Sequence, residues 1–104
     1  MAIVNGSSSN FESEVLNHKG KVVVDFNATW CGPCRMLAPI IEELSDELTD
    51  VKFVAVDVDE EDVLSENYEV STIPCVVLFE NGKEVNRNIG FVSKDDLQEF
   101  IGGK

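Results

Sequence analysis

Residues 21–35 read Lys-Val-Val-Val-Asp-Phe-Asn-Ala-Thr-Trp-Cys-Gly-Pro-Cys-Arg. Their first part, residues 21–26, is β-branched and apolar on both faces, which is typical of a strand covered by helices on both sides. Pro33 fits the first turn of a helix, because the amide that it lacks would be unsatisfied there in any case. The stretch therefore predicts a central strand followed by a helix, with Cys31 at the helix N-terminus and Cys34 one turn further in.

The spacing of the two cysteines permits thiol–disulfide exchange. Residues three apart on a helix are neighbours, so the Cys34 sulfur can attack a mixed disulfide that Cys31 forms with another protein. The free amides and the positive dipole end of a helix N-terminus favour a thiolate over a thiol. We therefore expect Cys31 to be the nucleophile and Cys34 the resolving thiol.

A metal clip and a permanent staple are the alternative uses of such a pair. A metal site normally needs four ligands, and beyond the pair the chain offers only Cys75 and His18 as thiol or imidazole ligands. A staple across so short a loop would remove little entropy from the unfolded chain. Reversible redox chemistry without a metal is the interpretation that we favour.

Length, charge and cysteine usage exclude several classes of function. The 104 residues, 43% of them hydrophobic, predict one domain, residues 1–104. A formal net charge of -12 repels phosphate backbones and anionic membranes, so we expect no nucleic-acid or membrane partner. The acidic run 57–62 lacks the glycine and glutamate positions of a calcium loop. Without a signal-peptide pattern or a long apolar window, we expect a soluble, cytoplasmic protein.

Helix and strand patterns alternate along the chain. Ser9 and Glu12 form a capping-box pattern, which predicts a first helix over residues 10–18. Apolar residues at helical spacing predict a helix over 34–48, kinked at Pro39. The remaining expected elements are strands over 51–58, 75–79 and 84–89, a hairpin turn at 81–82, helices over 62–68 and after the cap Ser93, and a frayed tail over 102–104.

This order predicts an α/β fold in which parallel crossovers and an antiparallel hairpin share one mixed sheet, flanked by about four helices. Asp25 interrupts the apolar central strand close to the thiols. A carboxylate in a low-dielectric site has a raised pKa and can exchange a proton near neutral pH, so Asp25 is a candidate base for Cys34. A strand-end carboxylate that faces solvent is the alternative.

The run 30–34 (Trp-Cys-Gly-Pro-Cys), taken with Asp25, Pro39, Ile73-Pro74 and Gly90, closely resembles the thioredoxin family over practically the whole chain. The resemblance implies the thioredoxin fold and an oxidoreductase that reduces disulfides in target proteins by dithiol–disulfide exchange. It also implies a role in electron transport and cell redox homeostasis, and it supports Asp25 as the proton-transfer group.

Partners and cofactors also follow from the resemblance. Electrons are implied to come from NADPH through a flavin-containing thioredoxin reductase, or from a ferredoxin-linked reductase. No cofactor is expected on the chain itself, which lacks the glycine fingerprint of dinucleotide sites. The expected partners are this reductase and disulfide-containing target proteins, and we expect a monomer.

Pro74 resembles the family's cis proline, with an ordinary trans turn proline as the alternative. The main chain of Thr72 and Ile73 is then expected to pair with an extended target segment by strand addition. The predicted docking site is an exposed apolar patch on an otherwise acidic protein, made by Trp30, Gly32, Pro33, Ile73, Pro74 and Gly90.

Several positions depart from the family pattern. Asn27 replaces a usual aromatic, which puts the local packing in question, and Arg35 replaces the commoner lysine. Cys75 replaces the usual threonine; we interpret it as a small buried hydrophobe, with a third redox thiol as the alternative. The strand lysine of many bacterial members has no counterpart around residues 55–56, so we expect Asp25 to titrate differently here.

Two further functions compete with a reductase. An isomerase or oxidant uses the same cysteine chemistry but needs an oxidising compartment. A binding module would dock a partner through the apolar patch whether or not its thiols turn over.

Overall fold

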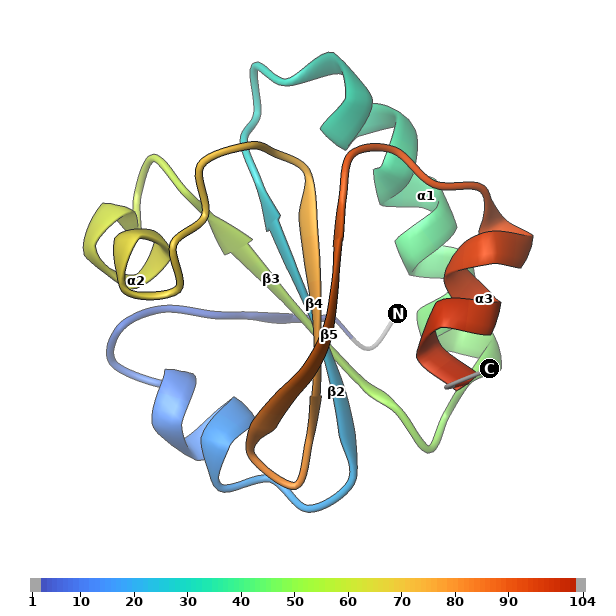
Figure 1. Ribbon diagram of the computed structural model, residues 1–104, viewed down its shortest axis with the longest axis horizontal. Coiled ribbons are helices and arrows are strands. Elements are labelled where there is room, and N and C mark those ends of the chain that lie inside the picture. Colours follow the sequence, from blue (N-terminus) through green and yellow to red (C-terminus); the bar gives the residue numbers. More distant parts are fainter. Residues whose placement is uncertain (1–2, 103–104) are drawn as a thin grey trace.

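The computed structural model describes residues 3–102, in which a five-stranded mixed sheet is covered by helices on both faces (Figure 1). The strands lie in the order β1-β3-β2-β4-β5. They are β1 (Ile3–Asn5), β2 (Lys21–Asn27), β3 (Lys52–Asp57), β4 (Cys75–Glu80) and β5 (Lys83–Ile89). The helices are the short π-helix η1 (Glu12–Leu16) and the α-helices α1 (Gly32–Glu47), α2 (Asp62–Asn67) and α3 (Lys94–Gly102).

Strand β2 occupies the centre of the sheet, as the sequence predicts. It pairs in parallel with β3 and antiparallel with β4, so both of its edges are hydrogen-bonded. The mixed α/β fold with a parallel crossover and the antiparallel β4–β5 hairpin is thereby confirmed. Asn81 and Gly82 both have positive φ angles, of 53° and 83°, as a two-residue Asn-Gly hairpin turn requires.

The alternation of β2 side chains divides the core into two layers. Val22, Val24 and Phe26 pack with the layer under η1 and α2. Val23 packs on the other face, with apolar residues of α1 and α3. Figure 1 shows the same division, with α1 and α3 on one side of the sheet and η1 and α2 on the other. Because side chains alternate along a strand, Asp25 projects from the face that carries α1.

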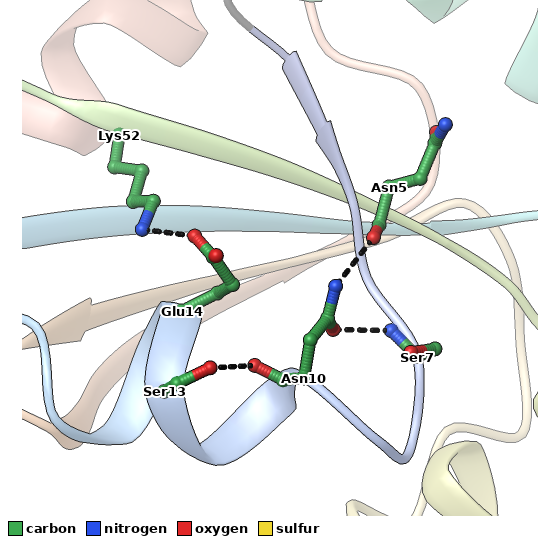
Figure 2. Close-up of polar contacts among 6 residues, drawn as sticks. All are labelled: Asn5, Ser7, Asn10, Ser13, Glu14 and Lys52. Atoms are coloured by element: carbon green, nitrogen blue, oxygen red, sulfur yellow. Dashed lines mark hydrogen bonds and ion pairs between the residues drawn. The ribbon is translucent and has the colours of Figure 1, made fainter.

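The N-terminal segment differs from the sequence prediction in two ways. The capping box is wrong: the Ser9 hydroxyl shares a 2.9 Å hydrogen bond with the Ser7 hydroxyl, and no side chain caps η1. Asn10 organises the turn instead, because its Oδ1 accepts the Ser7 amide at 2.7 Å and its Nδ2 donates to the Asn5 carbonyl at 2.9 Å (Figure 2). An amide side chain carries an acceptor oxygen and a donor nitrogen, so Asn10 bonds to both backbone groups at once.

Strand β1 was not predicted. Its three residues are too few to show an alternating pattern, and its parallel pairing with β3 is what defines it. An ion pair between Lys52 of β3 and Glu14 of η1 fastens the same segment to the sheet (Figure 2).

The remaining elements lie within a few residues of their predicted bounds. Helix α1 begins at Gly32, directly after Cys31 as the sequence predicts, and contains Pro39. Ser93 caps α3, since its Oγ accepts the Asp96 amide at 3.2 Å. Gly102, predicted to belong to a frayed tail, is the last residue of α3, and the rest of that tail lies outside the described residues.

Replacing Asn10 by alanine tests the role of its side chain in this turn. The variant Asn10→Ala loses two hydrogen bonds, so we expect its free energy of unfolding to fall by about 1–2 kcal/mol. Urea denaturation followed by circular dichroism measures this change. The control is Asn17→Ala, an exposed position whose side chain makes no hydrogen bond among the described residues. Equal stability of the two variants would contradict the role assigned to Asn10.

Candidate active site

The two cysteines lie at the start of α1. Cys31 is the N-cap residue, in an extended conformation, and Pro33 stands in the first turn as the sequence predicts. A disulfide joins Cys31 to Cys34, and their Cα atoms are 5.2 Å apart. The Cys34 amide donates to the Cys31 sulfur at 3.2 Å. This amide would stabilise negative charge on the same sulfur in the reduced protein.

Burial does not distinguish the two cysteine residues, because Cys31 is 5% exposed and Cys34 is 4% exposed. Their hydrogen bonding does, since the helix amide points at Cys31. The pair packs in a small cluster with Ala28 and the half-buried Ile73. The Cys31 sulfur also lies 3.9 Å from the Ile73 carbonyl oxygen, so it faces the segment that precedes β4.

Asp25 is buried and lies close to the thiols. It is only 6% exposed, which rules out the alternative of a carboxylate that faces solvent. Desolvation raises the pKa of Asp25 to about 7, and a hydrogen bond from Asn27 opposes part of that rise. A groove of about 540 Å³ is lined by Asp25, Asn27 and Cys34, among others. The structure thus brings the Asp25 carboxyl group and Cys34 to one groove.

The Asp25 carboxyl group is asymmetrically bonded. Its Oδ2 accepts from Asn27 Nδ2 at 3.4 Å, and the same Nδ2 donates to the Asp25 carbonyl at 3.0 Å. Its Oδ1 is buried and has no hydrogen-bond partner among residues 3–102. Ala55 lies opposite Asp25 on β3. The strand position next to the buried acid therefore carries a methyl group and no cation.

The predicted docking residues meet at one end of the sheet, where the loop before α1 and the segment before β4 lie (Figure 1). Trp30 is 66% exposed, and its Nε1 donates to Asp59 Oδ2 at 2.7 Å. Pro33 and Thr72 are exposed, whereas Gly32, Ile73 and Gly90 are half-buried.

The predicted patch is wrong at one residue: Pro74 is buried and is not part of the exposed surface. The Ile73–Pro74 peptide bond is cis, as the resemblance predicted. The Pro74 carbonyl accepts the Gly90 amide at 2.8 Å, which joins the end of β5 to this segment. Pro74 therefore supports the patch from beneath.

Cys75 is a buried core residue, as predicted. It is 1% exposed and packs in the layer under η1 and α2, in a different cluster from the two redox cysteines. Burial raises the pKa of the Cys75 thiol, with Arg87 acting in the opposite direction. Both features make it a poor nucleophile.

Two contacts of the site had no signal in the sequence. Asp59 belongs to an acidic run that composition alone presents as a solvated surface, yet it holds the Trp30 indole. Asn27 was noted only as a departure in packing, whereas its amide contacts the buried acid.

Arg35 donates from Nη1 to the Thr29 carbonyl at 3.1 Å and so ties the loop before α1 to the helix.

Residues 3–102 contain neither a metal-site arrangement of side chains nor a membrane-spanning helix. No cluster of three or more cysteine, histidine or acidic side chains has the arrangement of a metal site. In the same part of the chain, no helix combines the length and the apolarity that crossing a membrane requires.

A disulfide at a helix N-terminus, beside a buried carboxyl group and a cis proline, is typical of a thiol–disulfide oxidoreductase. The sequence model of the family described as Thioredoxin matches residues 2–103. The chain is 46% identical over 88 residues to a thioredoxin of Mycoplasmoides gallisepticum, an alignment that covers 85% of this chain and 88% of the relative. It is 41% identical over 102 residues to a thioredoxin of Bacillus subtilis, with 97% and 96% covered.

The chain belongs to the thioredoxin family. It is therefore a disulfide oxidoreductase of the kind that a thioredoxin reductase returns to the dithiol form. A thioredoxin of Chlamydia trachomatis, 44% identical over 91% of both chains, extends the same similarity to a third bacterial group.

Burial of Asp25 predicts that stability depends on pH. Below pH 3.8 both states hold the proton; between pH 3.8 and about 7 the unfolded chain releases it and the folded chain keeps it. The free energy of unfolding therefore falls as pH rises through this window, by at most ~4 kcal/mol from this group. We expect Asp25→Asn to remove this loss, so that the variant is the more stable protein at pH 8 and nearly equal at pH 4.

Urea unfolding of both proteins from pH 4 to pH 8 measures the difference. The control Asp50→Asn changes an exposed carboxylate and should leave the pH dependence unaltered. If Asp25→Asn is no more stable than the wild type at pH 8, burial does not destabilise the ionised carboxyl group.

Proposed function

We propose that this protein reduces protein disulfides in the cytoplasm through three residues: Cys31 attacks, Cys34 resolves and Asp25 transfers the proton. The observation that carries these roles is the position of the pair. The Cys31 sulfur accepts a helix amide at 3.2 Å, and Cys34 shares a groove with a carboxyl group whose pKa is about 7.

In the first step, the Cys31 thiolate attacks one sulfur of the target disulfide. The target S–S bond breaks, a mixed disulfide forms at Cys31, and one target sulfur leaves as a thiolate that takes a proton from water. The Cys34 amide and the dipole of α1 stabilise the attacking thiolate.

In the second step, the Asp25 carboxylate takes the proton of the Cys34 thiol. The Cys34 sulfur then attacks Cys31, the Cys31–target bond breaks, and the second target thiolate leaves and is protonated. The cysteine pair is oxidised by two electrons and the target disulfide is reduced by two. The Cα separation of 5.2 Å within the pair suits this ring closure.

The docking surface consists of Trp30, Gly32, Pro33, Thr72, Ile73 and Gly90, with Pro74 beneath it. Support for this role comes from the Ile73 carbonyl, 3.9 Å from the Cys31 sulfur, which places the backbone before β4 beside the reacting atom. An extended target segment that pairs with Thr72 and Ile73 would present its disulfide there.

The electron donor and the cellular setting are further parts of the proposal. A thioredoxin reductase supplies electrons from NADPH through a flavin or from ferredoxin, and this chain binds no cofactor of its own. We place the protein in the cytoplasm as a monomer and a single domain, residues 1–104, acting in electron transport and redox homeostasis. A reducing compartment suits a dithiol that must donate electrons. The net charge of -12 argues against nucleic-acid or membrane partners.

Serine variants of the pair test the assigned roles. Cys31→Ser should reduce insulin disulfides at the background rate, because the attacking sulfur is gone. Cys34→Ser should attack once and remain linked to its target through Cys31, since nothing resolves the mixed disulfide. Turbidity of reduced insulin measures the rate, and intact-mass spectrometry identifies the adduct.

The control Cys75→Ala removes a cysteine outside the pair and should keep the wild-type rate of reduction. An adduct on Cys34 in place of Cys31, or undiminished reduction by Cys31→Ser, would reverse the roles. A partner function that survives the double variant Cys31→Ser, Cys34→Ser would favour a binding module.

A further inference from the structure

We propose that Asn27 is a positioning residue for the reaction, because its side-chain amide holds one oxygen of Asp25 and leaves the other free to take the proton of Cys34. This inference rests on the proton-transfer role proposed above for Asp25. It assigns a function to the position where the chain departs from the family pattern.

Asn27 can reach Asp25 because residues two apart on a strand project from the same face. The amide is anchored by its 3.0 Å bond to the Asp25 carbonyl, and the contact with Oδ2 is longer, at 3.4 Å. Hydrogen bonds to a charged carboxylate are shorter than those to a neutral carboxyl group. The contact is therefore expected to tighten when Asp25 is ionised, the state in which it must act as a base.

No other described side chain donates a hydrogen bond to the Asp25 carboxyl group. The cross-strand neighbours of Asp25 are Ala55 on β3 and Val76 on β4, and neither carries a polar side chain. The Asn27 hydrogen bond is the one contact that lowers the pKa of Asp25 against the desolvation that raises it. Oδ1 stays without a partner within residues 3–102, so a single donor serves a buried group that can accept several.

Other titratable or charged groups surround the site. The same groove is lined by Cys34, Arg35 and Glu42 from α1. Asp57 at the end of β3 and Glu60 after it line a neighbouring hollow of about 350 Å³, which Asn27 also lines. On β4, Cys75 interacts electrostatically with Asp25. Variants at Asn27 leave all of these groups unchanged, so a change in Asp25 can be assigned to the lost amide.

The consequence for the reaction concerns the resolving step alone. A carboxylate held at Oδ2 keeps Oδ1 available for the Cys34 proton. Without the amide, the carboxyl group loses both its orientation and the hydrogen bond that favours its charged form. The attack by Cys31 uses neither, so the first step should keep its rate.

Two substitutions separate the hydrogen bond from the volume of the side chain. Asn27→Leu removes the donor and adds some bulk, whereas Asn27→Ala removes the donor and loses bulk, and it covers the case in which the leucine variant does not fold. Added bulk and lost bulk change the hydration of Asp25 in opposite senses, so a shift common to both variants reports the lost bond. The matched control is Asn5→Leu, because Asn5 lines the same groove but its side chain does not bond to Asp25.

The first measurement is the titration of the Asp25 carboxyl carbon by NMR in the oxidised protein, which requires no activity. We expect both Asn27 variants to titrate at a pH higher by roughly half a unit or more, about a threefold change in the ionisation equilibrium. The Asn5→Leu midpoint should equal that of the wild type. Unshifted midpoints in both Asn27 variants would overturn the proposal.

The second measurement is stopped-flow reduction of an aromatic disulfide whose thiol product is coloured, so that the two successive releases report the two steps. At pH 6 the second release should slow by about threefold in the Asn27 variants, with its pH profile displaced upward and the first release unchanged. The Asn5→Leu profile should match the wild type.

Asp25→Asn is the reference that separates the two levels of inference. If its second release keeps the wild-type pH profile, the proton-transfer role of Asp25 fails. If Asp25→Asn loses that profile while the Asn27 variants behave as Asn5→Leu does, only the role of Asn27 fails.

Discussion

The hydrogen bond from the Cys34 amide to the Cys31 sulfur is the contact on which the site depends, and it exists because β2 leads directly into α1. A central strand with two paired neighbours fixes where its chain leaves the sheet. A helix that begins one residue after Cys31 then directs its unpaired amides at that sulfur. The environment of the Cys31 sulfur is thus built from backbone geometry.

The second constraint is the alternation of side chains between the two faces of the sheet along β2. Alternation places Val22, Val24 and Phe26 in one apolar layer and turns Asp25 toward α1, the helix that carries the thiols. The same burial that raises the pKa of this carboxyl group makes its ionised form costly to the fold. Loss of stability as the pH rises from 3.8 to about 7 is therefore the expected companion of this raised pKa.

The fold could be predicted from sequence patterns that extend over many residues. Hydrogen bonds made by single side chains could not be predicted. The apolar run of β2, the helical spacing of α1 and the Asn81-Gly82 turn each repeat a signal, so the sheet and its helices followed from them. Strand β1 is too short to repeat one, and the turn at Asn10 depends on which of several polar side chains reaches the free amides. At the site, the motif gave Cys31 and Cys34, but nothing in it indicated contacts made across space, such as that of Asp59 with Trp30.

A neutral hydrogen-bond partner for Asp25 has a different consequence from a cation at the same place. An opposite charge within a few ångströms lowers the pKa of a carboxyl group by about 1–3 units. A single hydrogen bond contributes about 0.5–1.5 kcal/mol, equivalent to roughly one unit or less. With Ala55 opposite Asp25 and Asn27 beside it, the group is held in place while desolvation keeps its pKa near 7. A carboxyl group with a pKa near 7 is about half ionised at neutral pH. Its ionised form binds a proton more strongly than a carboxylate paired with a lysine, so it is the stronger base.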